Sequence, residues 1–191
     1  MAELVLFHHA QGQTVGFLDF GDRLREAGHT VHAPDLYEGQ SFKTLDEGLA
    51  YAESVGFGAL LNRGVDAVKG LPHGLVYAGI SLGVLPAQKL AQTRPGALGA
   101  LLFSSCVPVS EFGNGWPAGV PVQIHAMDKD PIFVDEGDLE AARELVKEAP
   151  QAELFLYPGN QHLFTDSSLP AHSPKAAGEA LNRALDFLSR L

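Results

Sequence analysis

The sequence predicts an open, doubly wound α/β fold. Helices are expected to cover both faces of a mostly parallel sheet of about six strands, which is a three-layer α/β/α arrangement. Two observations predict it. Short apolar runs of strand length alternate with amphipathic segments along the whole chain, and these runs are apolar throughout rather than at every second residue. Such strands are buried on both faces, and strand–helix alternation produces parallel strands joined by right-handed crossovers.

The first half of the chain contains three of these strands. The run ELVLFH is continuous and of strand length, and the next segment places Phe17, Phe20 and Leu24 at helical spacing before Gly28 ends it. A later stretch is helical in composition, although three glycines weaken that prediction. The elements expected here are strands at 3–8, 29–35 and 74–79 and helices at 15–28 and 44–69.

The second half repeats the alternation. The helix after the third strand is halted near TRPG, because proline and glycine interrupt regular structure. The final segment places Leu181, Leu185 and Leu188 on one face, as a helix packed on a core does. The elements expected here are strands at 97–105, 120–127 and 152–159 and helices at 82–93, 136–148 and 174–190.

Length and composition exclude several classes of protein. A chain of 191 residues suits one domain, residues 1–191, with little room for a lid domain. A formal net charge of −10 argues against nucleic acid and anionic membrane surfaces as partners. We expect a cytoplasmic protein, because no apolar stretch approaches a membrane span and the N-terminus lacks signal-peptide features. Cys106, the one cysteine, permits no internal disulfide and is expected to be a small buried hydrophobe.

The segment GISLG, residues 79–83, places a serine between two glycines where a strand is followed by a helix. A nucleophilic serine on such a turn needs an uncommon backbone conformation, and the glycines remove Cβ atoms that would clash. The following helix directs N–H groups towards an oxyanion. We therefore expect Ser81 to be a nucleophile and the Leu82 N–H to be an oxyanion donor. The second donor should come from the loop after the first strand, where Ala10 and Gln11 are the candidates.

An acid and a base follow later strands. Parallel sheets of this class bind ligands at the carboxyl ends of their strands. Asp128 and Asp130 come after the run VPVQIHA, and His162 comes after AELFLYPG. The order Ser, Asp, His is that of the α/β-hydrolase triad. Either aspartate can supply the acid, and His172 competes with His162 for the base, although only His162 directly follows a strand.

The other histidines do not form a recognisable metal site. His8 and His9 are neighbours at a strand end, so their side chains should point to opposite faces. One of them can line the pocket, and His9 is the candidate. His29 and His32 lack further ligands for a metal. No G-x-G-x-x-G or phosphate-loop signature follows the first strand. We therefore expect neither a metal nor a cofactor.

The chain resembles the dienelactone hydrolase family of α/β-hydrolases. The resemblance rests on HHAQG, GHTVHAPDLYEG, GISLG and VQIHAMDKDPIFV followed by LYPGNQHLFTD. It implies that Asp130 is the acid, His162 the base, and the N–H groups of Leu82 and Ala10 the oxyanion donors. The founding members of the family differ in carrying a cysteine nucleophile, with another glycine after the elbow and a glutamate near the position of His9.

These observations together predict a serine hydrolase that cleaves a small ester or lactone through an acyl-enzyme. Because a serine hydroxyl has no low-pKa thiolate form, His162 must act as its general base. Founding members of the family recognise an anionic lactone with basic residues, and no such pair is identified here, so dienelactone is not assigned as the substrate. Two alternatives stay open: a non-catalytic ligand-binding protein of the same fold, and a thioesterase or acyltransferase with the same triad. Oligomeric state is left unassigned.

Overall fold

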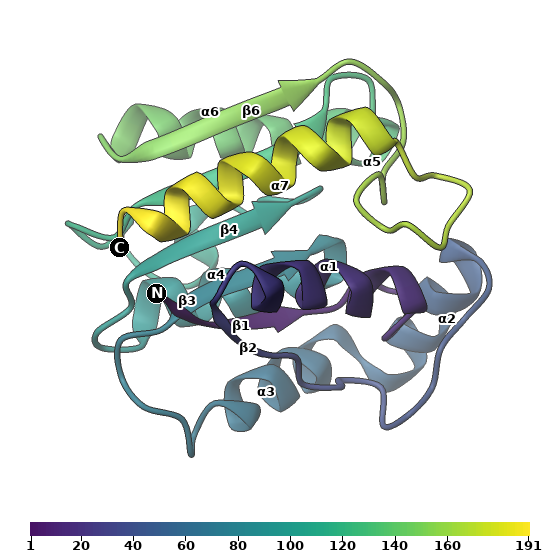
Figure 1. The fold of residues 1–191 in the computed structure, drawn as a ribbon, viewed down its shortest axis with the longest axis horizontal. Helices are drawn as coiled ribbons and strands as arrows, with labels where there is room; N and C mark the ends of the chain where they lie inside the picture. The colour runs from purple at the N-terminus through teal and green to yellow at the C-terminus, as the bar shows by residue number, and fades with distance from the viewer.

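Six strands form one parallel sheet in the computed structural model, which describes residues 1–191 (Figure 1). Every neighbouring pair of strands is parallel, and their order across the sheet is β2-β1-β3-β4-β5-β6. The chain thus builds outwards from β1 to β2 and then returns to the other side of β1. Its direction reverses between β1 and β3, where open α/β sheets have their ligand crevice. The strands are β1 (Glu3–Phe7), β2 (Thr30–His32), β3 (Val76–Ile80), β4 (Gly99–Phe103), β5 (Val122–Met127) and β6 (Ala152–Tyr157).

Helices cover both faces of this sheet. One apolar core lies between the sheet and helices α1 and α7, which are in front in Figure 1, and a second lies between the sheet and α2, α3, α4 and α6. The predicted three-layer α/β/α architecture is therefore confirmed. The helices are α1 (Val15–Glu26), α2 (Leu45–Val55), α3 (Phe57–Ala67), α4 (Val84–Thr93), α5 (Pro131–Asp135), α6 (Asp138–Glu148) and α7 (Pro174–Ser189).

The predicted elements appear in the expected order, with two differences. The segment 44–69 is two helices, because Gly56 has a φ of 92° that ends α2 and lets the chain change direction into α3. Helix α2 begins at a capping box in which Thr44 and Glu47 each bond the other's main chain. Helix α5 was not predicted from the sequence. It begins at Asp130, whose side chain accepts the N–H of Ile132.

Burial follows the expected pattern of a doubly covered sheet. Every residue of β3, β4 and β5 is buried, whereas the edge strand β6 is buried only at its first and last residues. Cys106 is fully buried and unpaired, as expected. None of the seven α-helices has the length and apolar character that crossing a bilayer requires.

Candidate active site

Ser81 lies directly after β3, on a single tight turn that leads into α4. Its φ is 51°, a left-handed conformation that non-glycine residues rarely adopt. A Cβ at Gly79 would collide with the carbonyl oxygen of Gly83, and one at Gly83 would lie 2.7 Å from the carbonyl oxygen of His8. The turn is so tight that neither glycine has room for a side chain, which is the reason for the pattern GISLG.

Three predicted residues meet in one hydrogen-bonded chain. Ser81 Oγ lies 2.8 Å from His162 Nε2, and His162 Nδ1 lies 2.7 Å from Asp130 Oδ2. Asp130 is fully buried, and its other oxygen accepts the Ile132 N–H at 3.0 Å. His162 is 9% exposed, and Ser81 is half-buried, so the hydroxyl end of the chain is the one that reaches solvent. In this arrangement the imidazole can accept the serine proton while the carboxylate fixes its tautomer.

The two alternatives that the sequence left open lie outside this chain. Asp128 is exposed, and its Oδ1 accepts the N–H of Gly159 at 3.0 Å. His172 places Nδ1 3.2 Å from the carbonyl oxygen of Phe164. The structure thus brings Asp130 and His162 to Ser81, and it gives Asp128 and His172 other partners.

Of the two candidate oxyanion donors in the loop after β1, only one has an amide without a partner in the chain. The Gln11 N–H donates to His9 Nδ1 at 3.2 Å, and its side chain donates to the Phe42 carbonyl at 3.1 Å. The Ala10 N–H, by contrast, donates to no group of the chain. Leu82 directly follows Ser81, at the turn that leads into α4. Leu82 and Ala10 are therefore favoured as the donor pair over Leu82 and Gln11.

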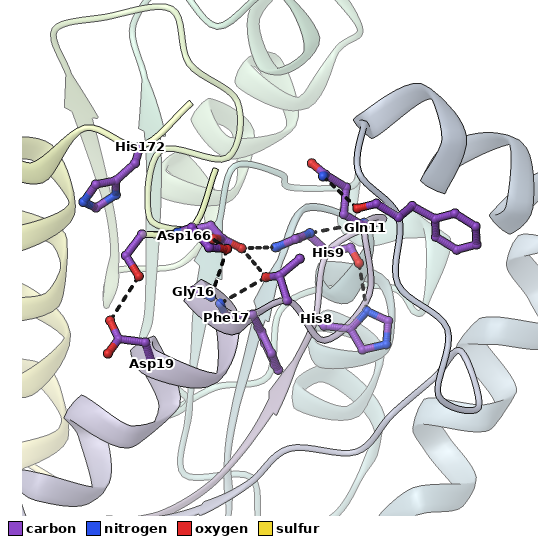
Figure 2. A network of polar contacts seen from close by, with 12 residues as sticks. His8, His9, Gln11, Gly16, Phe17, Asp19, Asp166 and His172 are labelled. Atoms are coloured by element: carbon purple, nitrogen blue, oxygen red, sulfur yellow. Dashed lines mark hydrogen bonds and ion pairs between the residues drawn. The ribbon is translucent and has the colours of Figure 1, made fainter. Parts of the chain in front are cut away.

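His9 does not line the site, contrary to the expectation from sequence. Its side chain has no exposed surface, and both ring nitrogens have protein partners, Asp166 Oδ2 at 2.8 Å and the Gln11 N–H. His8 is equally buried: its ring lies 2.8 Å from the His9 carbonyl oxygen and accepts the Leu36 N–H at 3.0 Å. Both rings pack edge-on against the ring of Phe17, with centroid distances of 5.9 Å for His8 and 6.3 Å for His9 (Figure 2). Burial lowers the pKa of His8 to about 4, so that ring is neutral.

Ser104, at the end of β4, is a site residue that the sequence analysis missed. Its hydroxyl donates to the main-chain carbonyl of His162, and its φ is 60°. It therefore holds the segment that carries the imidazole. Its position at the end of a predicted strand was the only signal available, because nothing in a single sequence pairs it with His162.

Asp138 is a second carboxyl group near His162. Its Oδ2 accepts the N–H of Cys106 at 3.2 Å. Burial raises the pKa of Asp138, while hydrogen bonds from Ser105 and Cys106 and the charge of His162 oppose that rise. Burial, with the Asp138 charge, raises the pKa of the Cys106 thiol to about 12, so this thiol stays protonated and is not a nucleophile.

An apolar cavity of about 270 Å³ opens near the elbow, at the same edge of the sheet. It lies between the start of α3, the first turn of α4 and the segment after β4, and Ser81, His162 and Asp130 are not among its lining residues. Glu111 is the one charged residue that lines it, and the Lys89 ammonium lies 5.8 Å from the ring centroid of Phe112, another lining residue. Its lining residues are Phe57, Gly58, Leu61, Leu85, Val107, Pro108, Glu111 and Phe112.

The sequence matches one protein family along almost its whole length. The model of the dienelactone hydrolase family matches residues 2–191. Among curated proteins, none matches the sequence.

Several solved structures share the fold. A dienelactone hydrolase-like promiscuous phosphotriesterase, P91, from metagenomic libraries is 18% identical with a TM-score of 0.75, covering 100% of this chain and 87% of that one. Esterase 2 of Thermogutta terrifontis, phosphonylated by cyclosarin, is 16% identical with a TM-score of 0.72, covering 99% and 82%. A cold-adapted esterase from an Arctic intertidal metagenomic library is 18% identical with a TM-score of 0.66, also covering 99% and 82%. At such low sequence identity, these comparisons show a shared fold.

Proposed function

The chain belongs to the dienelactone hydrolase family, a family of hydrolases, and from this premise we propose that it is a serine hydrolase of small esters or lactones. The observation that carries the proposal is the 2.8 Å contact between Ser81 Oγ and His162 Nε2, continued by the 2.7 Å contact between His162 Nδ1 and Asp130 Oδ2. A nucleophile, a base and an orienting acid in this geometry support acyl transfer.

The proposed reaction has two halves. Ser81 Oγ attacks the substrate carbonyl and passes its proton to His162 Nε2, while Asp130 stabilises the imidazolium. The Leu82 and Ala10 amides donate to the oxyanion, the tetrahedral intermediate collapses, and His162 returns the proton to the departing alkoxide. Water, deprotonated by His162, then attacks the acyl-enzyme and releases a carboxylic acid together with free Ser81. No metal or cofactor takes part in this proposed reaction.

The apolar cavity at the start of α4 supports a small uncharged substrate. At about 270 Å³ it is close to the lower end of small-molecule sites. Its largely apolar lining suits an uncharged alkyl or aryl group. We therefore propose an uncharged short-chain ester or an uncharged lactone as the substrate class. A thioester or a second alcohol as acyl acceptor would use the same acyl-enzyme.

The test is hydrolysis of a short-chain nitrophenyl ester by the wild-type protein and by Ser81→Ala. The loss expected on removing a triad nucleophile is roughly a thousandfold or more. Ser167→Ala is a matched control, because Ser167 is exposed and bonds only Asp19 on the surface. Equal rates for the wild type and Ser81→Ala would overturn the proposal.

A fluorophosphonate probe gives a second readout that does not require the right ester. It should label the wild-type protein at Ser81, as found by peptide mapping, and leave Ser81→Ala unlabelled. Labelling without ester hydrolysis would indicate a narrower substrate or another acyl acceptor. Neither labelling nor hydrolysis would favour a non-catalytic ligand-binding protein of this fold.

A further inference from the structure

A second histidine–aspartate pair lies beside the proposed site, outside the chain of Ser81, His162 and Asp130. His9 Nε2 is 2.8 Å from Asp166 Oδ2, and both side chains are fully buried. Figure 2 shows His9 between Asp166 on one side and Gln11 on the other. Neither residue of the pair bonds to Ser81, so the pair is not an alternative source of general base.

The Asp166 carboxylate is saturated with donors. Its Oδ2 accepts from His9 and from the Thr14 hydroxyl, and its Oδ1 accepts the N–H at 2.9 Å and the hydroxyl at 2.7 Å of Ser168. Burial by itself raises the pKa of Asp166, but the hydrogen bonds from His9, Thr14 and Ser168 outweigh it and lower the pKa to about 2. Asp166 is therefore a fixed carboxylate that only accepts hydrogen bonds.

These contacts determine the tautomer of His9. Because Asp166 only accepts, the hydrogen must be on Nε2, and because the Gln11 N–H points at Nδ1 from 3.2 Å, that nitrogen must be bare. His9 thus links a carboxylate to one specific amide of the loop after β1. With the Gln11 N–H held in this way, the Ala10 N–H is the one of these two neighbouring amides that has no partner.

The pair also joins two segments that the proposed reaction uses together. Asp166 lies four residues after His162, in the same buried segment, and its N–H donates to the Leu163 carbonyl at 3.2 Å. Gly16 permits the close packing of this segment on α1, because a Cβ there would lie 2.5 Å from the Ser168 nitrogen. The base-bearing segment and the oxyanion loop, residues 8–12, therefore meet at the bond between Asp166 and His9.

We propose that His9 and Asp166 are positioning residues that hold the Ala10 amide in place as an oxyanion donor and couple its position to that of His162. This inference rests on the proposed serine-hydrolase function and adds a role that the triad does not cover. The pair takes no proton from the substrate. It acts by fixing the peptide of the oxyanion loop, so its contribution appears when negative charge develops on the substrate oxygen.

Two substitutions at His9 separate its two bonds. His9→Asn places a side-chain oxygen near the position of Nδ1 and can still accept the Gln11 N–H, while it loses Asp166. His9→Gln places an amide nitrogen near Nε2 and can still donate to Asp166, while it loses the Gln11 N–H. Asp166→Asn replaces one accepting oxygen with an NH2 group, which then faces a hydrogen-bond donor instead of accepting from it. His125→Asn is the control, because His125 is a buried, hydrogen-bonded histidine bound to Tyr157 and Gln123 outside the site.

The first measurement is the steady-state kinetics of an ester and of its thionoester. Sulfur is a poor hydrogen-bond acceptor, so the oxo-to-thiono ratio of kcat/KM reports donation to the oxyanion. We expect Asp166→Asn and His9→Gln to lower kcat roughly tenfold to a hundredfold with little change in KM, and to shrink the oxo-to-thiono ratio. His125→Asn should lose stability and keep both values. Folded variants with an unchanged ratio, or with a raised KM alone, would overturn the proposal.

The second measurement needs no activity, which separates failure of this inference from failure of the proposed function. Long-range proton–nitrogen spectra of the wild type should show His9 protonated at Nε2 only. Hydrogen exchange of the Gln11 amide should accelerate roughly fivefold to tenfold in folded Asp166→Asn, as expected for the loss of one hydrogen bond. A His9 proton on Nδ1, or unchanged Gln11 exchange in that variant, would overturn the coupling whether or not esters are cleaved. Accelerated exchange in a protein that cleaves no ester would leave the coupling in place and overturn only the proposed function.

Discussion

Gly83 lies against the main chain of Phe7, the last residue of β1. A Cβ at Gly83 would approach the carbonyl oxygen of Phe7 more closely than any real Cβ atom does, and it would lie 2.7 Å from that of His8. The elbow after β3 therefore packs backbone to backbone on the end of β1. This contact places the proposed nucleophile beside the oxyanion loop, and it exists only because residue 83 has no side chain.

Gly83→Ala should destabilise the fold and abolish activity together, because rigid backbone on both sides cannot give way. We expect a loss of about 1–3 kcal/mol in the free energy of unfolding, as for an overpacked core position. Gly178→Ala is the matched control: it lies in α7 with open space around its α-carbon, and the change should stabilise the protein by about 0.5–1 kcal/mol. Urea denaturation measures both. An unaltered midpoint for Gly83→Ala would contradict the packing described here.

Asp130→Asn should remove most of the activity with little loss of substrate binding. The asparagine cannot hold His162 in the tautomer that accepts the Ser81 proton, and a loss of roughly ten-thousandfold in kcat is expected for such a change. Asp128→Asn is the sequence-matched control, since Asp128 is exposed and bonds Gly159 instead. Ester hydrolysis by both variants decides between the two aspartates. Comparable losses in both would argue against Asp130 as the orienting acid.

His162→Ala should lose most of the activity and His172→Ala should keep it, as expected for Asp130→Asn and Asp128→Asn. Loss of the proposed base is expected to cost roughly a thousandfold or more in kcat, while the protein remains folded. His172 contacts only the carbonyl of Phe164, so its removal should leave kcat within about threefold of the wild type. A fluorophosphonate labelling rate gives the same comparison for the acylation step alone. Rapid labelling of His162→Ala would show that Ser81 does not depend on this imidazole.

Ser104→Ala should lower kcat without preventing folding. The hydroxyl of Ser104 donates to the carbonyl of His162, and its removal leaves that buried oxygen unpaired at a cost of about 1–3 kcal/mol. The imidazole then loses part of its support, so we expect a drop of roughly tenfold in kcat. Ser54→Ala on the surface of α2 serves as the control. Thermal melting and ester hydrolysis, measured together, separate the two effects.

Stability should fall as the pH drops from 7 to 5. Burial lowers the pKa of His8 to about 4, and burial together with the charge of Arg183 lowers that of His125 to about 3. Both rings are therefore neutral in the folded protein, while in the unfolded chain they take up protons below about pH 6.5. The stability that these two neutral rings contribute is fully present above that pH. It is lost as the pH falls, by about 2 kcal/mol of unfolding free energy per histidine between pH 7 and 5.

Urea denaturation at several pH values measures this dependence. His125→Gln should lower the stability at pH 7 and also remove a large part of the slope between pH 7 and 5, because this group no longer titrates, while His8 and His29, whose pKa burial also lowers, still do. A slope that is the same in this variant would show that other groups cause the pH dependence. The carboxylate of Asp166 affects stability in a separate pH range, because its lowered pKa makes stability fall only below about pH 4.

Local patterns in the sequence were sufficient for the architecture. Apolar runs such as ELVLFH and VYAGI are buried strands because nothing polar interrupts them, and their alternation with amphipathic segments allows little but a parallel sheet. The boundary at Gly56 was harder to predict, since one glycine in a helical stretch is tolerated as often as it breaks the helix. Only its positive φ decides that α2 and α3 are separate.

The sequence alone also determined which serine stands on the elbow, because the steric demand of that turn is written in five consecutive residues. Only the family resemblance favoured Asp130 over Asp128 and Ala10 over Gln11. The residue pattern by itself could not, since these choices depend on hydrogen bonds between distant segments or on which amide a buried ring already accepts. The same reason hid the bond between His9 and Asp166, which joins residues 157 positions apart. Such bonds are directional and short, so they form only after the packing of the strands and loops has set the distances.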